Sequence, residues 1–236
     1  KRLDDVEASK ATGVLYEKLF IRHWDAWADG RNNQLFIASF SADGKLNGEP
    51  KKITNGIDGD VPSKPFGDAS EYAFSPDSKT VVFNVRIAGK TEAWSTNFDL
   101  YSVSVDGMGV AKNLTADNPA WDTGPVFSPD GRTLAFTMLP HEMAPHKDGI
   151  MPRTLRNARL VTFDMASRVV TNHARVDFDV SPGAPRWSPD GKQLWFTASD
   201  RVWNSLYAYD VAAKSYSKRT TDVLVQGLSV NADGSK

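Results

Sequence analysis

Almost the same phrase occurs three times in this chain, and this repeat constrains the fold more than any other feature. The copies run over Phe74–Phe83, Phe127–Phe136 and Trp187–Phe196, and each contains Ser-Pro-Asp followed by Gly or Ser. Proline presets φ, aspartate bonds its own backbone and glycine accepts positive φ, so the phrase predicts a tight turn between two strands. The strand after each turn is apolar on both faces, as in a strand covered by layers on both sides.

A second phrase follows each turn and extends the repeat to four strands, which we call A to D in chain order. It occurs at Asp99–Val103, Arg159–Phe163 and Ser205–Tyr209, with an earlier copy at Gln34–Ala38. A polar turn and a short strand that tends to finish in Thr come next. A four-stranded unit repeated at this spacing is typical of a propeller blade. The predicted fold class is therefore all-β, a partial β-propeller with TolB-like or WD-type four-stranded blades.

The predicted blades do not form a closed ring. They are the back half of a blade at residues 14–55, full blades at 70–115, 124–174 and 184–221, and the start of another at 226–236. Since a propeller closes to remove its sheet edges, we interpret the chain as a fragment of a seven- or eight-bladed propeller. We also expect little helix, the three turn motifs on one rim, and buried side chains for Phe74, Phe127 and Trp187.

Composition excludes some partners and leaves the compartment open. The 236 residues are 40% hydrophobic and 24% charged, with net charge −1 and scattered basic residues, so no nucleic-acid footprint is expected. No apolar stretch has the length of a membrane span. The chain lacks an initiator Met and an apolar signal region, which indicates a removed export signal or a start partway into a longer protein. We expect a periplasmic or secreted bacterial protein; the absence of cysteine fits a cytoplasmic one equally well.

Several segments resemble the propeller half of the prolyl oligopeptidase family of serine peptidases. They are Tyr16–Trp27, Gly89–Tyr101 and the three turn motifs, and the resemblance is closest to bacterial dipeptidyl peptidase 5 and acylaminoacyl peptidase-like members. Many propellers, including TolB, share the turn motif, so Arg22–Trp27 and Glu92–Asn97 are the more specific segments. The resemblance extends from about Val14 onward and weakens at Leu139–Asn157.

This resemblance implies that the propeller caps a C-terminal α/β-hydrolase domain with a Ser-Asp-His triad. The chain has no Gly-x-Ser-x-Gly nucleophile elbow, and the nearest approach to one is Gly227–Asn231. We therefore place no catalytic residue in this chain. The implied partners are that catalytic domain of the same protein and short peptides, with no cofactor; a homodimer is left open.

The connections between strands B and C vary in length and lie on one rim, where function usually sits on a rigid scaffold. Candidate substrate-binding residues on this rim are Glu92, Trp94, Asp25, Trp24 and Trp203. The resemblance implies that a propeller carboxylate holds the free α-amine of the substrate, a charge-assisted interaction for which Glu92 is the best candidate. Trp94 would shield that ion pair from water. The alternative is that Glu92 is a solvated loop residue.

The other candidates also have structural alternatives. Trp24 and Asp25 could line a peptide channel by indole stacking and charge. Alternatively, Trp24 packs between blades together with Trp27 while Asp25 fixes a turn. Trp203 could face the same cavity, although core packing is the more common fate of tryptophan.

Two apparent motifs fail on spacing, so no metal site is predicted. His141 and His146 are five residues apart with Pro145 between them, whereas a zinc helix needs a spacing of four. The run Gly89–Thr91 lacks the earlier glycine of a phosphate-binding loop. Two functions remain: the substrate-gating propeller of a serine exopeptidase acting on short peptides, and a non-enzymatic TolB-like propeller that binds proteins. The specific segments favour the first.

Overall fold

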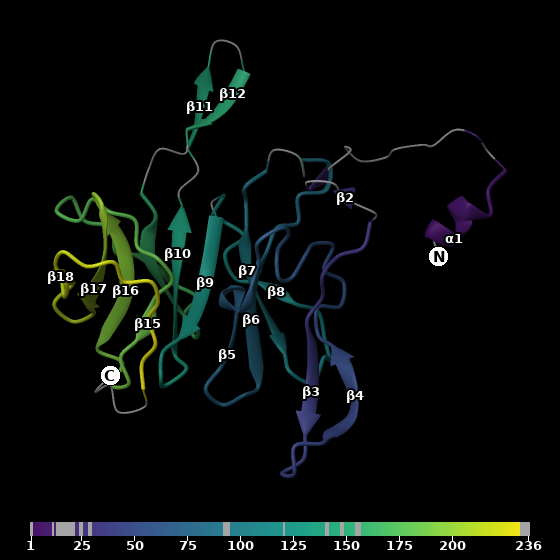
Figure 1. Ribbon diagram of the computed structural model, residues 1–236, viewed down its shortest axis with the longest axis horizontal. Helices are drawn as coiled ribbons and strands as arrows, with labels where there is room; N and C mark the ends of the chain where they lie inside the picture. The colour runs from purple at the N-terminus through teal and green to yellow at the C-terminus, as the bar shows by residue number, and fades with distance from the viewer. Residues whose placement is uncertain are drawn as a thin grey trace.

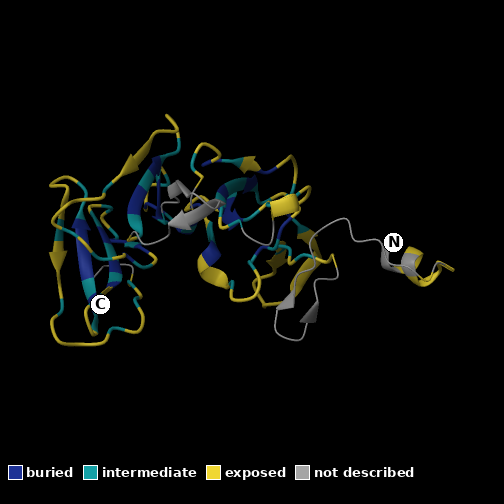
Figure 2. Cartoon of the chain, turned by 90° about the horizontal axis from the view of Figure 1, so that it is seen from above, coloured by how far each residue is buried: buried dark blue, intermediate teal, exposed yellow. Residues whose placement is uncertain are grey.

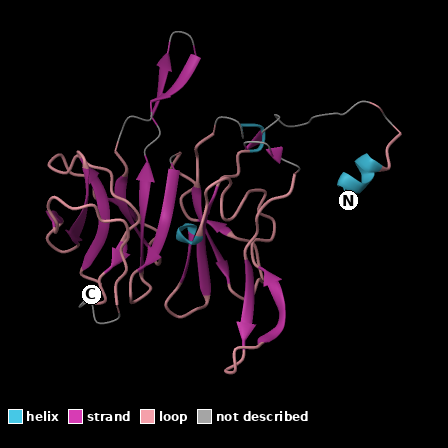
Figure 3. Cartoon of the chain, in the orientation of Figure 1, coloured by secondary structure: helices cyan, strands magenta, loops and turns pink. Residues whose placement is uncertain are grey.

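Strands dominate the chain, as the repeats predict (Figure 3). The computed structural model describes residues 2–10, 12, 22–23, 26–27, 30–91, 95–119, 121–139, 142–146, 149–153 and 157–231. Within this part of the chain, the helical elements are one short α-helix and two 3-10 turns. They are α1 (Arg2–Glu7), η1 (Ala69–Glu71) and η2 (Gly89–Thr91).

Three four-stranded antiparallel sheets lie side by side (Figure 1). The first sheet contains β5 (Tyr72–Phe74), β6 (Thr80–Val85), β7 (Asp99–Ser104) and β8 (Lys112–Asn113). The second contains β9 (Trp121–Phe127), β10 (Thr133–Leu139), β13 (Arg159–Asp164) and β14 (Val170–Asn172). The third contains β15 (Arg186–Trp187), β16 (Gln193–Asp200), β17 (Trp203–Asp210) and β18 (Ser215–Lys218).

Three hairpins complete the described strands. They are β1 (Arg22–His23) with β2 (Ala26–Trp27), β3 (Phe36–Phe40) with β4 (Leu46–Lys52), and β11 (Glu142–His146) with β12 (Gly149–Arg153). The β3–β4 hairpin precedes the first sheet, where the repeat predicts the back half of a blade. Residues 226–231, in the segment predicted to begin another blade, contain no strand. The predicted all-β partial propeller is confirmed.

The Ser-Pro-Asp turns form the same hydrogen bonds in each sheet. In the first sheet the Ser75 hydroxyl donates to Asp77 at 2.6 Å and accepts from the Thr80 amide at 2.9 Å. The turns at Ser128 and Ser188 repeat both contacts at the same distances. The bond from the serine hydroxyl is the main reason why the pKa of each turn aspartate lies below its usual range. The turn is therefore rigid, and it fixes the register of strands A and B.

The three turns lie on one edge of the sheets, as predicted. A Cβ built on Gly131 would lie 3.4 Å from Cδ of Pro76, in the turn of the sheet before it. One built on Gly191 would lie 3.7 Å from Cδ of Pro129. The turns of the second and third sheets therefore each contact the turn of the preceding sheet. We call this edge the turn rim, and the opposite edge, where strand B connects to strand C, the connection rim.

The core lies between neighbouring sheets, which pack face to face (Figure 2). Phe127 of the second sheet packs with Val82 and Leu100 of the first. Trp187 of the third sheet joins Ala135 and Leu160 of the second, and its indole N–H donates to the Val126 carbonyl at 3.2 Å. An aromatic residue at the end of strand A thus anchors the second sheet on the first and the third sheet on the second.

The expectation that Phe74 is buried is wrong, because this side chain is 51% exposed. Phe127 and Trp187, its equivalents, are buried as predicted. Those two residues pack against strands of the sheet before them. Of the described strands before the first sheet, β3 and β4 correspond to strands C and D, and β1 and β2 pair with each other in a separate hairpin. The face that would cover Phe74 is thus not formed by described strands.

A threonine after strand D holds strand C in the first and third sheets and in the β3–β4 hairpin. The hydroxyl oxygens of Thr54, Thr115 and Thr220 accept from the amides of Leu35, Leu100 and Leu206 at 3.2, 3.0 and 2.9 Å. The second sheet has Ala174 at the equivalent position, directly after the residue that pairs with Leu160. The repeat is therefore broken at this point of the second sheet.

Candidate functional site

The connection rim differs from sheet to sheet, whereas the turn rim repeats. In the first sheet β6 and β7 are joined by a segment that contains η2. In the second sheet the connection contains the β11–β12 hairpin, which projects from the body of the molecule (Figure 1). In the third sheet a turn of two residues, Arg201 and Val202, joins β16 to β17. A variable rim on a constant scaffold is the expected place for a functional site.

Most of the predicted substrate-binding residues lie outside the described residues. This applies to Glu92, Trp94, Trp24 and Asp25. Trp203 is described and is the first residue of β17, where it pairs with Asp200 at the end of the hairpin. Its side chain is half-buried, and it does not line either of the two cavities described below. Its predicted role in substrate binding stays a prediction.

A buried carboxylate, Asp122, lies between the first and second sheets at the connection rim. Its side chain is fully buried, and its Oδ1 accepts from Asn118 Nδ2 at 2.7 Å. Burial raises the pKa of this carboxyl to about 7, against the lowering effect of hydrogen bonds from Thr115 and Asn118. Asp122 is therefore largely protonated at acidic pH and begins to ionise as the pH approaches 7.

Other polar groups on the first sheet near Asp122 are incompletely satisfied. Asp99 accepts from Asn113 Nδ2 at 2.7 Å, and burial raises the pKa of its carboxyl also. Several buried side-chain atoms have no hydrogen-bond partner among the described residues. On this rim they are Asn84 Nδ2, Asn97 Oδ1, Asp99 Oδ1 and Asp122 Oδ2. Burying a polar atom without a hydrogen bond is energetically costly, so this region contains polar atoms whose hydrogen bonds the described residues do not supply.

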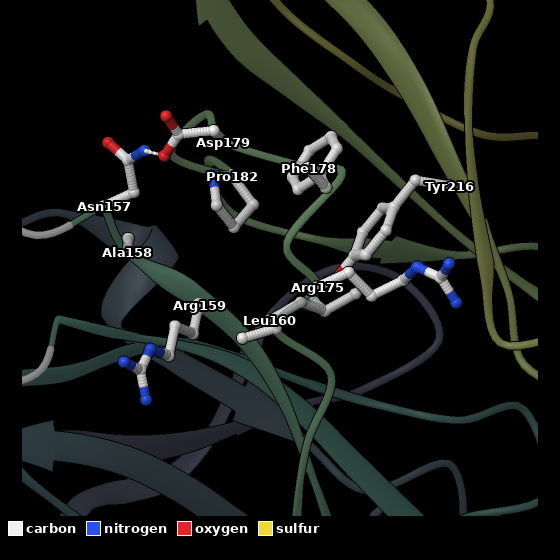
Figure 4. A pocket seen from close by; sticks show the side chains of 10 residues that line it. Asn157, Ala158, Arg159, Leu160, Arg175, Phe178, Asp179, Pro182 and Tyr216 are labelled. Atoms are coloured by element: carbon white, nitrogen blue, oxygen red, sulfur yellow. Dashed lines mark hydrogen bonds between the residues drawn. The ribbon is translucent and has the colours of Figure 1, made fainter.

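A cavity of about 270 Å³ opens between the second and third sheets at the point where Ala174 replaces threonine (Figure 4). Leu160 and Ala174 belong to its floor, and Phe178 and Pro182 to its wall. Asn157 and Asp179 stand at one end, joined by a hydrogen bond of 2.8 Å from Asn157 Nδ2 to Asp179 Oδ1. Tyr216 and Arg175 stand at the other end. We call this the Ala174 cavity.

Aromatic and polar contacts stabilise the wall of the Ala174 cavity. The rings of Phe178 and Tyr216 stack with centroids 3.9 Å apart, and the Tyr216 hydroxyl donates to the His173 carbonyl at 2.9 Å. The guanidinium of Arg175 pairs with Asp177 at 2.7 Å and donates to the Lys214 carbonyl at 3.0 Å. The charge of Arg175 is thus balanced outside the cavity.

His173 connects the second and third sheets beneath this wall. Its Nε2 lies 2.8 Å from the Thr162 hydroxyl and its Nδ1 lies 2.8 Å from the Tyr209 hydroxyl. Burial, helped by the positive charge of Lys214, lowers the pKa of the imidazole to about 4. His173 is therefore a neutral structural group that bonds one hydroxyl from each sheet.

A second cavity, of about 420 Å³, lies at the turn rim between the same two sheets. The carboxylates at its edge belong to Asp130, Asp164 and Asp190, and all three accept hydrogen bonds within their own turns. Their residues are thus already engaged in building the turns. The Ala174 cavity, at the variable rim, is the better candidate for a binding site.

The described residues contain no group of three or more side chains suited to hold a metal ion. His141 lies outside them, and Glu142–His146 is a β-strand rather than the helix that a zinc motif requires. None of the described helices is both long and apolar enough to cross a membrane.

The fold and the variable rim define a class of protein, the propellers built from TolB-like blades. A TolB-type protein of Agrobacterium tumefaciens aligns with 80% of this chain and 63% of its own at a TM-score of 0.50 and 19% identity. A puromycin hydrolase aligns with 79% of this chain and 27% of its own, at a TM-score of 0.52 and 18% identity. A puromycin-hydrolyzing peptidase of Mycobacterium tuberculosis aligns with 86% of this chain and 29% of its own, at a TM-score of 0.51 and 16% identity. These structures support the propeller fold alone.

The chain is also similar in sequence to proteins named dipeptidyl-peptidase 5. The chain is 28% identical to dipeptidyl-peptidase 5 of Arthroderma otae over 214 residues, which are 86% of this chain and 28% of that protein. It is 29% identical to dipeptidyl-peptidase 5 of Aspergillus fumigatus over 223 residues, 88% of this chain and 29% of that protein. The predicted resemblance to the dipeptidyl peptidase 5 proteins and their propellers is confirmed. The chain spans less than a third of the length of these relatives. No family model matches it.

Sequence reasoning missed both Asp122 and the Ala174 cavity. Asp122 lies within the strand β9, whereas the predicted functional carboxylates, Glu92 and Asp25, belong to segments predicted to connect strands. The missing threonine at Ala174 was a usable signal, since the repeat places threonine after strand D at Thr54 and Thr115.

Proposed function

We propose that this chain is the substrate-gating propeller portion of a serine exopeptidase of the dipeptidyl or acylaminoacyl peptidase type, acting on short peptides. The observation that carries the proposal is the similarity to dipeptidyl-peptidase 5 proteins over 86–88% of the chain. The sequence has no Gly-x-Ser-x-Gly elbow, so the catalytic triad would belong to another domain of the same protein. We also propose an exported, periplasmic or secreted location.

The proposed gating follows from the shape of the propeller. Blades that cover an active site would exclude folded proteins and admit short peptides, and the variable connection rim would contact the substrate. Within that rim we retain Glu92 as the group that binds the free α-amine, with Trp94, Asp25, Trp24 and Trp203 around the path of the peptide. For Glu92, Trp94, Asp25 and Trp24 the support is the resemblance of their segments to the peptidases. For Trp203 it is the position at the equivalent connection of the last full blade.

Hydrolysis by the full-length protein tests the proposal. We expect it to cleave dipeptidyl chromogenic substrates, and we expect this 236-residue chain alone to be inactive because it carries no activated serine. In the full-length protein, Glu92→Gln should reduce kcat/KM for substrates with a free amine. The reduction should correspond to a loss of about 1.5–3 kcal/mol in transition-state stabilisation, the scale of a hydrogen bond to a charged group. N-blocked substrates should be affected far less. A full-length protein without peptidase activity would contradict the proposal.

A second candidate function is that of a non-enzymatic, TolB-like propeller that binds protein partners. The fold similarity to a TolB-type protein favours it, because this chain covers 63% of that protein. The two candidates differ in the remainder of the gene. A downstream hydrolase domain supports the peptidase, and a stop codon directly after Lys236 supports the binding module.

A further inference from the structure

An aromatic stack stands at the connection rim between the first and second sheets. Trp121 is the first residue of β9, and β9 begins at the edge from which the β11–β12 hairpin projects (Figure 1). The indole of Trp121 stacks on the ring of Phe98, with centroids 5.3 Å apart and planes inclined by 24°. The guanidinium of Arg86 also lies over the Phe98 ring, 5.6 Å from its centroid. Phe98 thus supports the indole from the first sheet.

The backbone holds the two rings of this stack in place. Phe98 and Trp121 form a parallel bridge, and the Asp122 amide donates to the Phe98 carbonyl at 3.0 Å. On its other side Trp121 pairs with Leu139 at the end of β10. A ring that is fixed in this way loses little conformational freedom when a ligand stacks on it, which favours binding.

The two rings differ in exposure. Phe98 is buried, whereas Trp121 is 39% exposed. Since Phe98 covers one face of the indole, the exposed part lies on the other face and the edges. Tryptophan offers a ligand a large, rigid and apolar contact surface, and it is enriched among the residues that dominate binding energies. The exposed indole therefore provides a flat contact surface on the variable rim.

The equivalent place in the next repeat has the same backbone contacts without aromatic residues. Asn204 and Leu224 form a parallel bridge, and the Val225 amide donates to the Asn204 carbonyl at 2.8 Å. Neither Asn204 nor Leu224 carries a ring, and Leu224 is exposed. The framework of the repeat thus does not require an aromatic residue at this place. This comparison indicates that Trp121 has a role other than holding the strands together.

The charge beside the stack favours a neutral aromatic ligand over a cationic one. The face of an indole attracts both rings and cations. Phe98 already contacts the Arg86 cation, whose Nη1 donates to the Ser95 carbonyl at 2.8 Å. This fixed positive charge would repel a second cation placed on Trp121, whereas it would not repel an uncharged ring.

We propose that Trp121 is the platform on which an aromatic side chain of a short peptide stacks. Trp121 would thus set a preference for aromatic residues at one subsite of the connection rim. This inference deepens the proposed function, on which the choice of a peptide as the ligand rests. It differs from the role proposed for Glu92, because the contact is made to a side-chain ring and involves no amine.

Binding of N-acetyl-Gly-Phe-Gly-amide to the isotope-labelled 236-residue chain, followed by NMR, tests the platform. Both ends of this peptide are blocked, so recognition of a free amine plays no part. We expect the peptide to shift the indole N–H resonance of Trp121, which is identified by its loss in Trp121→Leu. An unchanged Trp121 resonance at saturating peptide would overturn the proposal.

Two matched peptides define the chemistry of the contact. Cyclohexylalanine in place of phenylalanine keeps a six-membered ring and removes its π electrons, so this peptide should bind about three- to tenfold more weakly. Lysine in place of phenylalanine should also bind more weakly, because it brings a second cation to the stack. Equal affinity of the phenylalanine and cyclohexylalanine peptides, or tighter binding of the lysine peptide, would contradict an aromatic subsite.

Two variants and one control locate the preference. Trp121→Leu keeps an apolar side chain and removes the indole, so the preference for phenylalanine over cyclohexylalanine should disappear. Trp121→Phe restores a ring and should recover part of that preference. Leu224→Ala truncates the exposed residue at the equivalent place and should leave both affinities within twofold. A preference that survives Trp121→Leu, in a variant whose other resonances are unchanged, would overturn the platform.

The outcome is distinguishable from that of the proposed function. Stacking of the phenylalanine peptide on Trp121, together with an inactive full-length protein, would overturn the peptidase and retain the platform. Peptide hydrolysis by a full-length protein in which Trp121→Leu changes KM equally for phenylalanine and cyclohexylalanine substrates would retain the peptidase and overturn the platform.

Discussion

The two interfaces between the three full sheets bury opposite kinds of titratable group. Between the first and second sheets lies Asp122, an acid whose pKa burial raises to about 7. Between the second and third sheets lies His173, a base whose pKa burial lowers to about 4. Both groups are therefore predominantly neutral in the folded protein between those two values, although one would be anionic and the other partly cationic in water.

This difference shows how a repeated backbone can carry unlike interfaces. The strand order, the turns and the position of the anchoring aromatics are the same in the second and third sheets. The polar residues between the sheets are not repeated: Asp122 bonds a loop, whereas His173 bonds a hydroxyl on each side. The repeat thus fixes the framework and leaves the chemistry of each interface to single residues.

The largest effect is expected from Asp122→Asn. The folded state favours the protonated acid, so its contribution is intact below the unfolded pKa of about 4 and is lost as pH rises to about 7. The asparagine cannot ionise, and its oxygen can still accept from Asn118. We expect the variant to be about 2 kcal/mol more stable than the wild type at pH 8, with the gain shrinking toward pH 4. Urea unfolding across this pH range measures it.

Asp117→Asn is the matched control for this comparison, because Asp117 is exposed in the connection that leads into β9. Because this side chain is exposed, the exchange should change the free energy of unfolding by less than about 0.5 kcal/mol. A gain for Asp122→Asn that is constant from pH 4 to pH 8 would show that repacking, rather than removal of a buried charge, is responsible.

A smaller effect of opposite sign is expected from His173. Since its folded pKa is depressed, its contribution is intact above the unfolded pKa of about 6.5 and is lost as pH falls through 4. We expect a loss of about 1–2 kcal/mol over this window after screening of a partly exposed ring is allowed for. His173→Asn should remove this pH dependence, as measured by unfolding at several pH values against the wild type.

Tyr209→Phe separates burial from hydrogen bonding at this interface. It removes the hydroxyl beside Nδ1 and keeps the imidazole buried, so about 1 kcal/mol should be lost while the pH dependence remains. If Tyr209→Phe abolished the pH dependence as fully as His173→Asn, the hydroxyl rather than burial would be its cause.

The framework could be predicted from sequence because its signals are local. The Ser-Pro-Asp turns are determined by neighbouring residues. The strands after them are apolar on both faces, which predicts that each sheet is covered on both sides. Phe74 was mispredicted because its burial depends on strands of another blade, which its own repeat does not encode. Asp122 and His173 could not be found for the same reason. Their pKa values are set by burial and by contacts such as that between His173 and Tyr209, which are distant in sequence.

The smallest effect concerns the turn at which the first sheet departs from the other two. Ser78 has φ of 58°, whereas Gly131 and Gly191 occupy the equivalent positions at 71° and 69°. A side chain in this left-handed region costs about 1–2 kcal/mol in the folded state, and glycine removes that cost. Glycine also makes the unfolded chain more flexible, which offsets roughly half of the stabilisation. We therefore expect Ser78→Gly to stabilise the protein by about 0.5 kcal/mol, measured as a shift in the urea midpoint at constant slope.

Gly131→Ser is the reverse exchange in the second sheet. Its new Cβ would lie 3.4 Å from Cδ of Pro76, an ordinary contact, so backbone conformation alone should determine the result. A loss of similar size is expected. If both exchanges destabilised the protein, Ser78 would hold a contact specific to the first sheet, and the three turns would not be energetically equivalent despite their shared hydrogen bonds.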